Sequence, residues 1–168
     1  MVKGMLLTCK ERPSSVSTRQ SFAALMELYE RNYILMRRLV PAAPSEGTRW
    51  MSQLSDGLPL ELEVLERHRY TSDIRLTYRF QRAEGIVLEP NLRVRVYHDA
   101  RAAEVMAAHL RHLPDFPLPT QSGFDLRDRW RVNRFLYKWL RYCLHQGHRF
   151  EDRTAAAAGS NNRIQTPT

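Results

Sequence analysis

The stretch "LRVRVYHDARAAEV", residues 92–105, decides how the middle of the chain folds. Leu92, Val94 and Val96 alternate with polar residues, which is the period-two pattern of a half-buried β-strand. The alanine-rich sequence that follows predicts a helix over residues 100–113, with Asp99 as the N-cap that accepts a backbone N–H of its first turn. His98 then ends the strand on the face of Val94 and Val96, where an imidazole needs a hydrogen-bond partner or a function.

Outward from this stretch, the same alternation predicts strands over residues 58–64 and 74–80, and more weakly over 48–54. Apolar residues at helical spacing predict helices over residues 21–40 and 125–146, with Trp139 and Leu140 in the core and Gly147 as a left-handed C-terminal cap. The predicted fold class is α+β: an antiparallel sheet of about four strands with the N- and C-terminal helices packed on one face.

The chain of 168 residues has 43% apolar residues, which fits one domain with one core. Residues 17–150 are the predicted domain, because residues 1–16 and 151–168 lack hydrophobic periodicity and are predicted to be disordered. No apolar run approaches the ~20 residues of a membrane span. Together with only two cysteines, this predicts a soluble cytoplasmic protein that has no contact with a membrane.

The formal charge is +8, and three lysines among 26 basic residues leave 23 arginines. Much of the excess falls on the last helix, where six basic side chains at spacings of three and four lie within about 40° of one line along the helix. This basic stripe consists of Arg127, Arg131, Arg134, Lys138, Arg141 and His145. The stripe indicates either a solvated helix face or a surface for a nucleic-acid backbone.

The outward faces of the predicted strands are also charged, with acidic residues on one strand and arginines on the next two. These residues are Glu61 and Glu63, then Arg75 and Arg79, then Arg93 and Arg95. Opposite charges on neighbouring strands pair across a sheet for roughly 0.2–1 kcal/mol each. The pattern therefore indicates a solvated ladder of ion pairs, with an arginine floor for an anionic ligand as the alternative.

Catalytic motifs are sparse. His98-Asp99 resembles the start of a metal-dependent phosphohydrolase site, but the further His and Asp ligands of such a site are missing. The pairs His109/His112 and His145/His148, with Cys143 nearby, offer metal-ligand types without a Cys-x-x-Cys. Phosphate-binding glycine loops and the G-x-S-x-G nucleophile motif are absent from the sequence. We therefore expect no metal and no cofactor, and favour a protein without catalytic activity.

Three segments resemble the YqiB-like family of uncharacterised proteobacterial proteins: "ERNYILMRRLVP" at 30–41, "RYTS" with "VRVYHDARAAEV" at 69–72 and 94–105, and "NRFLYKWLRYCLHQG" at 133–147. The resemblance implies a small cytoplasmic protein and implies no activity. The residues that match its motifs are Glu30, Asn32, Arg37, Arg38, Arg69, Tyr70, Tyr97, His98, Asp99, Glu104, Asn133, Arg141 and Tyr142. Four members of the basic stripe, Arg127, Arg131, Arg134 and Lys138, depart from the family pattern.

These observations predict a binding or regulatory module that recognises an anionic ligand or a protein partner. In this hypothesis Arg69, His98 and Arg141 recognise the anionic group. Tyr70 and Tyr142 stack or hydrogen-bond with it, and Asp99 orients the end of the strand. The alternative is a nucleic-acid-binding protein that uses Arg127, Arg131, Arg134 and Lys138, and a hydrolase centred on His98-Asp99 is less favoured.

Overall fold

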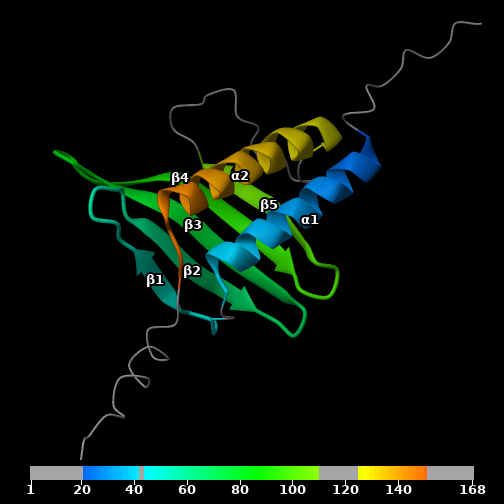
Figure 1. Ribbon diagram of the computed structural model, residues 1–168, viewed down its shortest axis with the longest axis horizontal. Coiled ribbons are helices and arrows are strands. Elements are labelled where there is room, and N and C mark those ends of the chain that lie inside the picture. The colour runs from blue at the N-terminus through cyan, green and yellow to red at the C-terminus, as the bar shows by residue number, and fades with distance from the viewer. Residues whose placement is uncertain (1–20, 42–43, 110–124, 151–168) are drawn as a thin grey trace, which may run out of the picture.

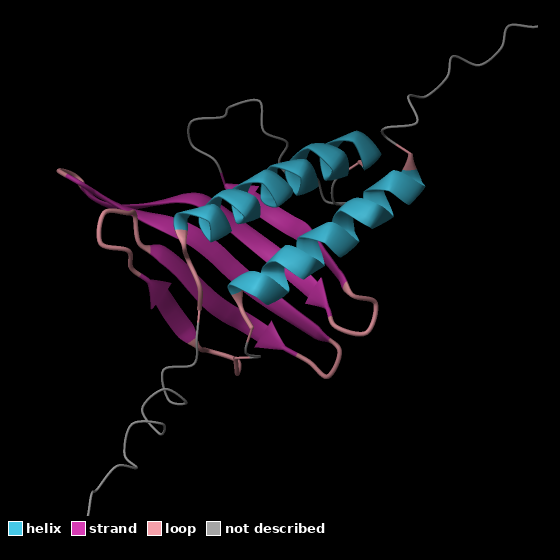
Figure 2. Cartoon of the chain, viewed as in Figure 1, coloured by secondary structure: helices cyan, strands magenta, loops and turns pink. Residues whose placement is uncertain are grey.

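The computed structural model describes residues 21–41, 44–109 and 125–150, which form two helices and a five-stranded antiparallel sheet. The elements in chain order are α1 (Phe22–Leu39), β1 (Arg49–Ser52), β2 (Leu60–Arg67), β3 (Thr71–Arg82), β4 (Gly85–Tyr97), β5 (Ala102–His109) and α2 (Leu126–Gln146). The strands lie in the order of the chain, each antiparallel to the next. Both helices lie on one face of the sheet and run in the same direction (Figures 1 and 2).

The helix ends follow from local capping. Ser21 is the N-cap of α1, where its hydroxyl accepts the backbone N–H of Ala24 at 3.2 Å. Asp125 caps α2 in the same way, with its carboxylate 2.8 Å from the backbone nitrogen of Asp128. At the other end of α2, Gly147 has a φ of 97°, a left-handed conformation that costs glycine little. The predicted cap at Gly147 is confirmed.

The core lies between the helices and the face of the sheet that carries the alternating apolar residues. Leu62, Leu76 and Val94 from three successive strands are fully or almost fully buried beneath Leu136 and Leu140 of α2. Burial of an aliphatic side chain of this size contributes roughly 1.5–3 kcal/mol. Trp139 is also buried, edge-on to Tyr78 with 5.6 Å between the ring centroids, so the predicted core positions Trp139 and Leu140 are confirmed.

The predicted helix over residues 100–113 is wrong, because Ala102–His109 is the edge strand β5, paired with β4. Residues 98–101 form a tight turn between these strands, and Arg101 adopts a φ of 52°. Asp99 therefore caps no helix: its carboxylate accepts the N–H of Ala100 at 2.8 Å. Strand pairing prevails over the helix propensity of alanine, and the sheet consequently has five strands. Residues 110–113 lie outside the described residues.

The face of the sheet away from the helices carries paired charges, as the alternation predicts. Asp73, which is only 3% exposed, lies between Arg93 and Arg95, with 2.9 Å from Arg93 Nε to Oδ2 and 2.6 Å from Arg95 Nε to Oδ1. Burial raises the pKa of Asp73, but the hydrogen bonds and charges of Arg95 and Arg93 outweigh it, and the pKa lies below its usual value of 3.8. The same pairing joins Glu63 to Arg49 and Arg75, and Glu61 to Arg79.

Asn133, on α2, joins the two helices to the edge of the sheet. Its side-chain oxygen accepts the backbone N–H of Val105 at 3.0 Å, which satisfies a donor of β5. The side-chain nitrogen of Asn32, on α1, donates to the backbone carbonyl oxygen of Asn133 at 3.3 Å, and the side-chain nitrogen of Asn133 donates to the backbone carbonyl oxygen of Arg129. Asn32 and Asn133 are both fully buried. We call this arrangement the Asn133 clamp.

The expectations about residues 1–16 and 151–168 fall outside the described residues, and so do those about residues 17–20. In the described part of the chain, no helix is both long and apolar enough to cross a membrane.

We expect Asn133→Ala to lower the free energy of unfolding by about 1–3 kcal/mol, because the buried N–H of Val105 loses its acceptor and finds no water. Urea unfolding followed by circular dichroism measures this change. Gln146→Ala, which removes an exposed amide at the end of the same helix, is the control and should change stability by less than about 0.5 kcal/mol. Equal effects of the two substitutions would contradict the clamp.

Candidate anion-binding site

Two hairpin turns meet at one end of the sheet. The turn between β2 and β3 holds His68, Arg69 and Tyr70, and the turn between β4 and β5 begins at His98. The backbone N–H of His98 donates to the carbonyl oxygen of Tyr70 at 2.8 Å, which fixes one turn against the other. The guanidinium of Arg69 lies 5.0 Å from the centre of the Tyr70 ring. The structure thus brings together four of the predicted site residues, Arg69, Tyr70, His98 and Asp99.

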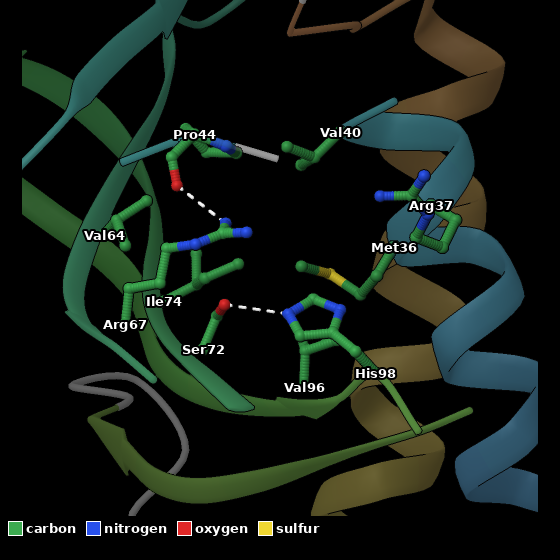
Figure 3. Close-up of a pocket in the computed structure, with 10 residues that line it drawn as sticks. All are labelled: Met36, Arg37, Val40, Pro44, Val64, Arg67, Ser72, Ile74, Val96 and His98. Atoms are coloured by element: carbon green, nitrogen blue, oxygen red, sulfur yellow. Dashed lines mark hydrogen bonds between the residues drawn. The ribbon is translucent and has the colours of Figure 1, made fainter. Parts of the chain in front are cut away.

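The imidazole of His98 turns inward, as predicted, and lines a small hollow beneath α1 (Figure 3). Its Nε2 atom lies 2.9 Å from the Ser72 hydroxyl, whereas Nδ1 faces α1 and has no hydrogen bond among the described residues. We call this hollow the His98 cavity. Its volume of about 20 Å³ holds only one or two water molecules. Its lining residues are Met36, Arg37, Val40, Pro44, Val64, Arg67, Ser72, Ile74, Val96 and His98.

The His98 cavity is electropositive. Burial lowers the pKa of His98 below its usual 6.5, and the positive charges of Arg67 and Arg37 lower it further, while Asp99 acts in the opposite direction. Figure 3 shows the two arginines on opposite walls, with an Arg67 guanidinium nitrogen 2.9 Å from the Pro44 carbonyl oxygen. A neutral imidazole between two guanidinium groups can donate to or accept from an incoming group.

A wider groove adjoins the His98 cavity, and Arg37 lines both. This α1 groove has a volume of about 810 Å³ and lies between one face of α1 and the turn that connects β4 to β5. Its lining residues are Glu30, Tyr33, Ile34, Arg37, Arg38, Ala100 and Arg101. Within the described ranges, Arg37, Arg38 and Arg101 form no ion pair. Among the described residues, the two hollows together are lined by four arginines and by one carboxylate, that of Glu30.

Arg141 and Tyr142, also predicted for this site, lie elsewhere. Tyr142 lines a hollow of about 180 Å³ with Tyr78 and residues of the loop between β1 and β2. Tyr78 lies seven positions along β3 from Thr71, or about 23 Å from the hairpin turns. Arg141 lies over the ring of Tyr137 at 5.7 Å. The predicted six-residue site is therefore divided between opposite ends of the sheet.

The six residues of the basic stripe are exposed along α2, as their spacing predicts. The carboxylate of Asp128 lies 4.0 Å from Arg131, at the edge of ion-pair range. Between Arg134 and His145 the stripe has no carboxylate in contact among the described residues.

The candidate metal ligands that the structure describes do not form a metal-binding group. His148 is buried, with Nδ1 3.0 Å from the Ser52 hydroxyl, and His145 is exposed. Cys143 lies 3.3 Å from the Tyr78 hydroxyl, and burial raises the pKa of its thiol to about 11. His112 lies outside the described residues. Among those described, no group of three or more His, Cys, Asp or Glu residues could hold a metal ion.

Sequence reasoning did not include Arg37, Arg67, Ser72 and Arg101 in one site. Ser72 continues the inward alternation of Ile74 and Leu76, and this signal could have placed it beside His98. The proximity of Arg37 on α1 to Arg101 in a distant turn has no signal in a single sequence.

The fold and the site define an α+β domain with two helices on one face of a five-stranded meander and an arginine-rich hollow at one end of the sheet. Residues 35–149 match the family described as "Protein of unknown function (DUF1249)", and the chain belongs to this family. It is similar to the uncharacterized protein YqiB of Escherichia coli K12, and equally to YqiB of the O6:H1 and O157:H7 strains. In each case the identity is 32% over 130 residues, covering 75% of this chain and 90% of the relative. No solved structure matches. The predicted YqiB-like resemblance is confirmed.

The free energy of unfolding should fall as the pH is lowered from about 7.5 to about 5.5, because His98 and His148 both have a lowered pKa in the folded protein. Well above pH 6.5 both imidazoles are neutral in the folded and in the unfolded protein. Below that pH the two histidines bind more protons in the unfolded chain than in the folded one, and this difference favours unfolding. Urea unfolding at the two pH values measures the loss. His148→Gln should make it smaller, while the exposed His145→Gln should leave it unchanged. Stability that does not vary with pH in this range would contradict the assignment.

Proposed function

We propose that this protein is a non-catalytic cytoplasmic binding or regulatory module, and that it recognises an anionic group at the end of the sheet where the two hairpin turns meet. The observation that carries this proposal is the gathering of Arg37, Arg38 and Arg101, without ion-pair partners in the described part of the chain, beside His98. Elsewhere on the sheet, arginines such as Arg93 and Arg95 are held by a carboxylate. Arginines that lack this neutralisation retain their capacity to bind an anion.

Each predicted residue at this end has a role in the proposal. His98 hydrogen-bonds the anionic group through Nδ1, because Ser72 already occupies Nε2. Arg69, over the Tyr70 ring in the neighbouring turn, adds positive charge at this end of the sheet, although neither residue is among the described lining of the two hollows. Asp99 shapes the turn by accepting the Ala100 N–H. Arg141, at the other end of the sheet, does not take part.

The same geometry favours binding over hydrolysis. The Asp99 carboxylate bonds to the backbone of its own turn, so His98 lacks the carboxylate partner that orients a catalytic base. Ser72 is almost completely buried, and the His98 cavity admits only one or two waters beside it. An ester or phosphoester substrate would not reach the hydroxyl group.

Thermal unfolding in the presence of inorganic phosphate or succinate tests the proposal. A ligand that binds only the folded state raises Tm. At a free ligand concentration 100 times Kd, it adds about 2.7 kcal/mol to the free energy of unfolding. We expect either anion to raise Tm relative to chloride at equal ionic strength, and Arg37→Gln with Arg38→Gln to abolish the increase. Arg134→Gln with Lys138→Gln, which removes the same charge from α2, is the control and should preserve it. An increase that survives the first pair of substitutions would place the anion elsewhere, and no increase with either anion would remove the proposal.

A second candidate is nucleic-acid binding through the basic stripe, favoured because the stripe is exposed along α2 with the exposed ring of Tyr142 at its edge. Binding of single-stranded RNA, measured by fluorescence anisotropy, should weaken steeply with salt. Replacing Arg131, Arg134 and Lys138 by Glu should abolish it without a change in the circular dichroism spectrum. The absence of RNA binding at low salt would exclude this candidate.

A further inference from the structure

The α1 groove differs from a simple anion site because it is partly apolar. Ile34 projects from α1 into the groove with 57% of its surface exposed, and Tyr33 lines the wall beside it. Arg38 and Arg101 line the same groove, and Arg37 lines both the groove and the His98 cavity. An exposed apolar contact surface therefore adjoins a small electropositive hollow.

The dimensions of the two hollows limit what can occupy them. The His98 cavity, at about 20 Å³, accepts a group that replaces one or two waters, and the two oxygens of a carboxylate meet that condition. The groove follows α1 from Glu30 to Arg38, which is about 12 Å at 1.5 Å per residue. An extended chain covers that length with about four residues.

We propose that the α1 groove and the His98 cavity together dock a short acidic segment of a partner protein, with a carboxylate side chain in the cavity and a neighbouring apolar side chain on Ile34. This inference rests on the proposed function, since it names the class of partner for the same site. The carboxylate receives hydrogen bonds from His98 Nδ1 and from the guanidinium of Arg37. Arg38 and Arg101 form ion pairs with further acidic residues of the segment along the groove.

A peptide suits this surface better than a nucleic acid. A binder of single-stranded nucleic acid needs a track of positive charge and several aromatic faces for successive bases, whereas the described lining of this groove has one aromatic ring, that of Tyr33, beside the exposed aliphatic side chain of Ile34. An acidic segment with an apolar residue complements both properties, because apolar contacts supply affinity and charge complementarity supplies orientation.

His98 makes the docking dependent on pH. The groups that face the His98 ring are Arg37 from α1, Arg67 from β2 and Ser72 from β3. Two carboxylates lie nearby: Asp99 follows His98 in the same turn, and Glu46 accepts the backbone N–H of Arg67. A carboxylate bound at Nδ1 favours the protonated imidazole, so binding and protonation support each other. Affinity therefore rises as the pH falls from about 7.5 to about 6, and His98→Gln removes that rise.

A displayed library of random short peptides, selected on the full-length protein, tests the inference without assuming a sequence. We expect the selected peptides to share an acidic residue next to an apolar one. A selected peptide should bind at least about tenfold more weakly to Ile34→Ser and to Arg37→Gln. Arg134→Gln, a matched loss of charge on α2, should leave its affinity unchanged. Arg101→Gly should also weaken binding without loss of the turn, because a φ of 52° suits glycine.

The outcomes separate this inference from the function on which it rests. If phosphate or succinate raises Tm through Arg37 and Arg38, but the selected peptides are no richer in acidic and apolar residues than the library, the docking inference fails and anion recognition stands. If Arg37→Gln weakens binding of the peptides but Ile34→Ser does not, the apolar part of the inference fails. If single-stranded RNA also binds in a way that requires Arg37 but not Ile34, RNA becomes the better occupant of the groove. If replacing Glu151 and Asp152 by their amides strengthens the selected peptides' binding, the chain's own C-terminal segment competes for the groove, and the partner's segment is not its sole occupant.

Discussion

The amide side chain of Asn133 is the point at which the rest of the structure is held together. The outer backbone donor of β5 at Val105 is a buried polar group that would cost stability without a partner, and α2 supplies the acceptor. Because the side-chain nitrogen of Asn32 donates to the backbone carbonyl oxygen of Asn133 and, at 3.5 Å, to its side-chain oxygen, the same residue also links α1 to α2. The position of α1 above the hairpin turns, and with it the α1 groove, therefore depends on a contact at the opposite side of the helix.

The arginines of this domain have two kinds of environment. On the open face of the sheet, arginines and carboxylates alternate between strands and neutralise one another, with Asp73 held between Arg93 and Arg95. At the meeting point of the hairpin turns, the arginines come from α1, β2 and a turn, and no strand register supplies carboxylates to face them. A paired charge stabilises the fold to a small extent, whereas an unpaired one remains available to a ligand.

Much of the fold could be predicted from the sequence because its signals are local. The helices α1 and α2 follow from apolar spacing and from caps within a few residues, and β2 to β4 follow from strict alternation. The prediction failed at β5, where Ala102 and Ala103 favour a helix locally and only pairing with Tyr97 and Val96 decides for a strand. Of the candidate site, the sequence could predict that Arg69, Tyr70, His98 and Asp99 lie close together. It could not exclude Arg141 from the site, because only the structure shows that the C-terminal end of α2 lies over the opposite end of the sheet.

The sequential order of the strands also bears on how the chain reaches this structure. Each strand pairs with the next one in the chain, so the sheet can assemble hairpin by hairpin, with only short loops to close. The contact between Asn32 and Asn133 spans 101 residues and requires the ends of the domain to meet. Contact between α1 and α2 thus has the highest entropic cost of loop closure in the described structure, and we expect partial unfolding to begin with the separation of these two helices. Separation of α1 would break the contact between Asn32 and Asn133 and dismantle the α1 groove in one step, while the strands beneath it stayed paired.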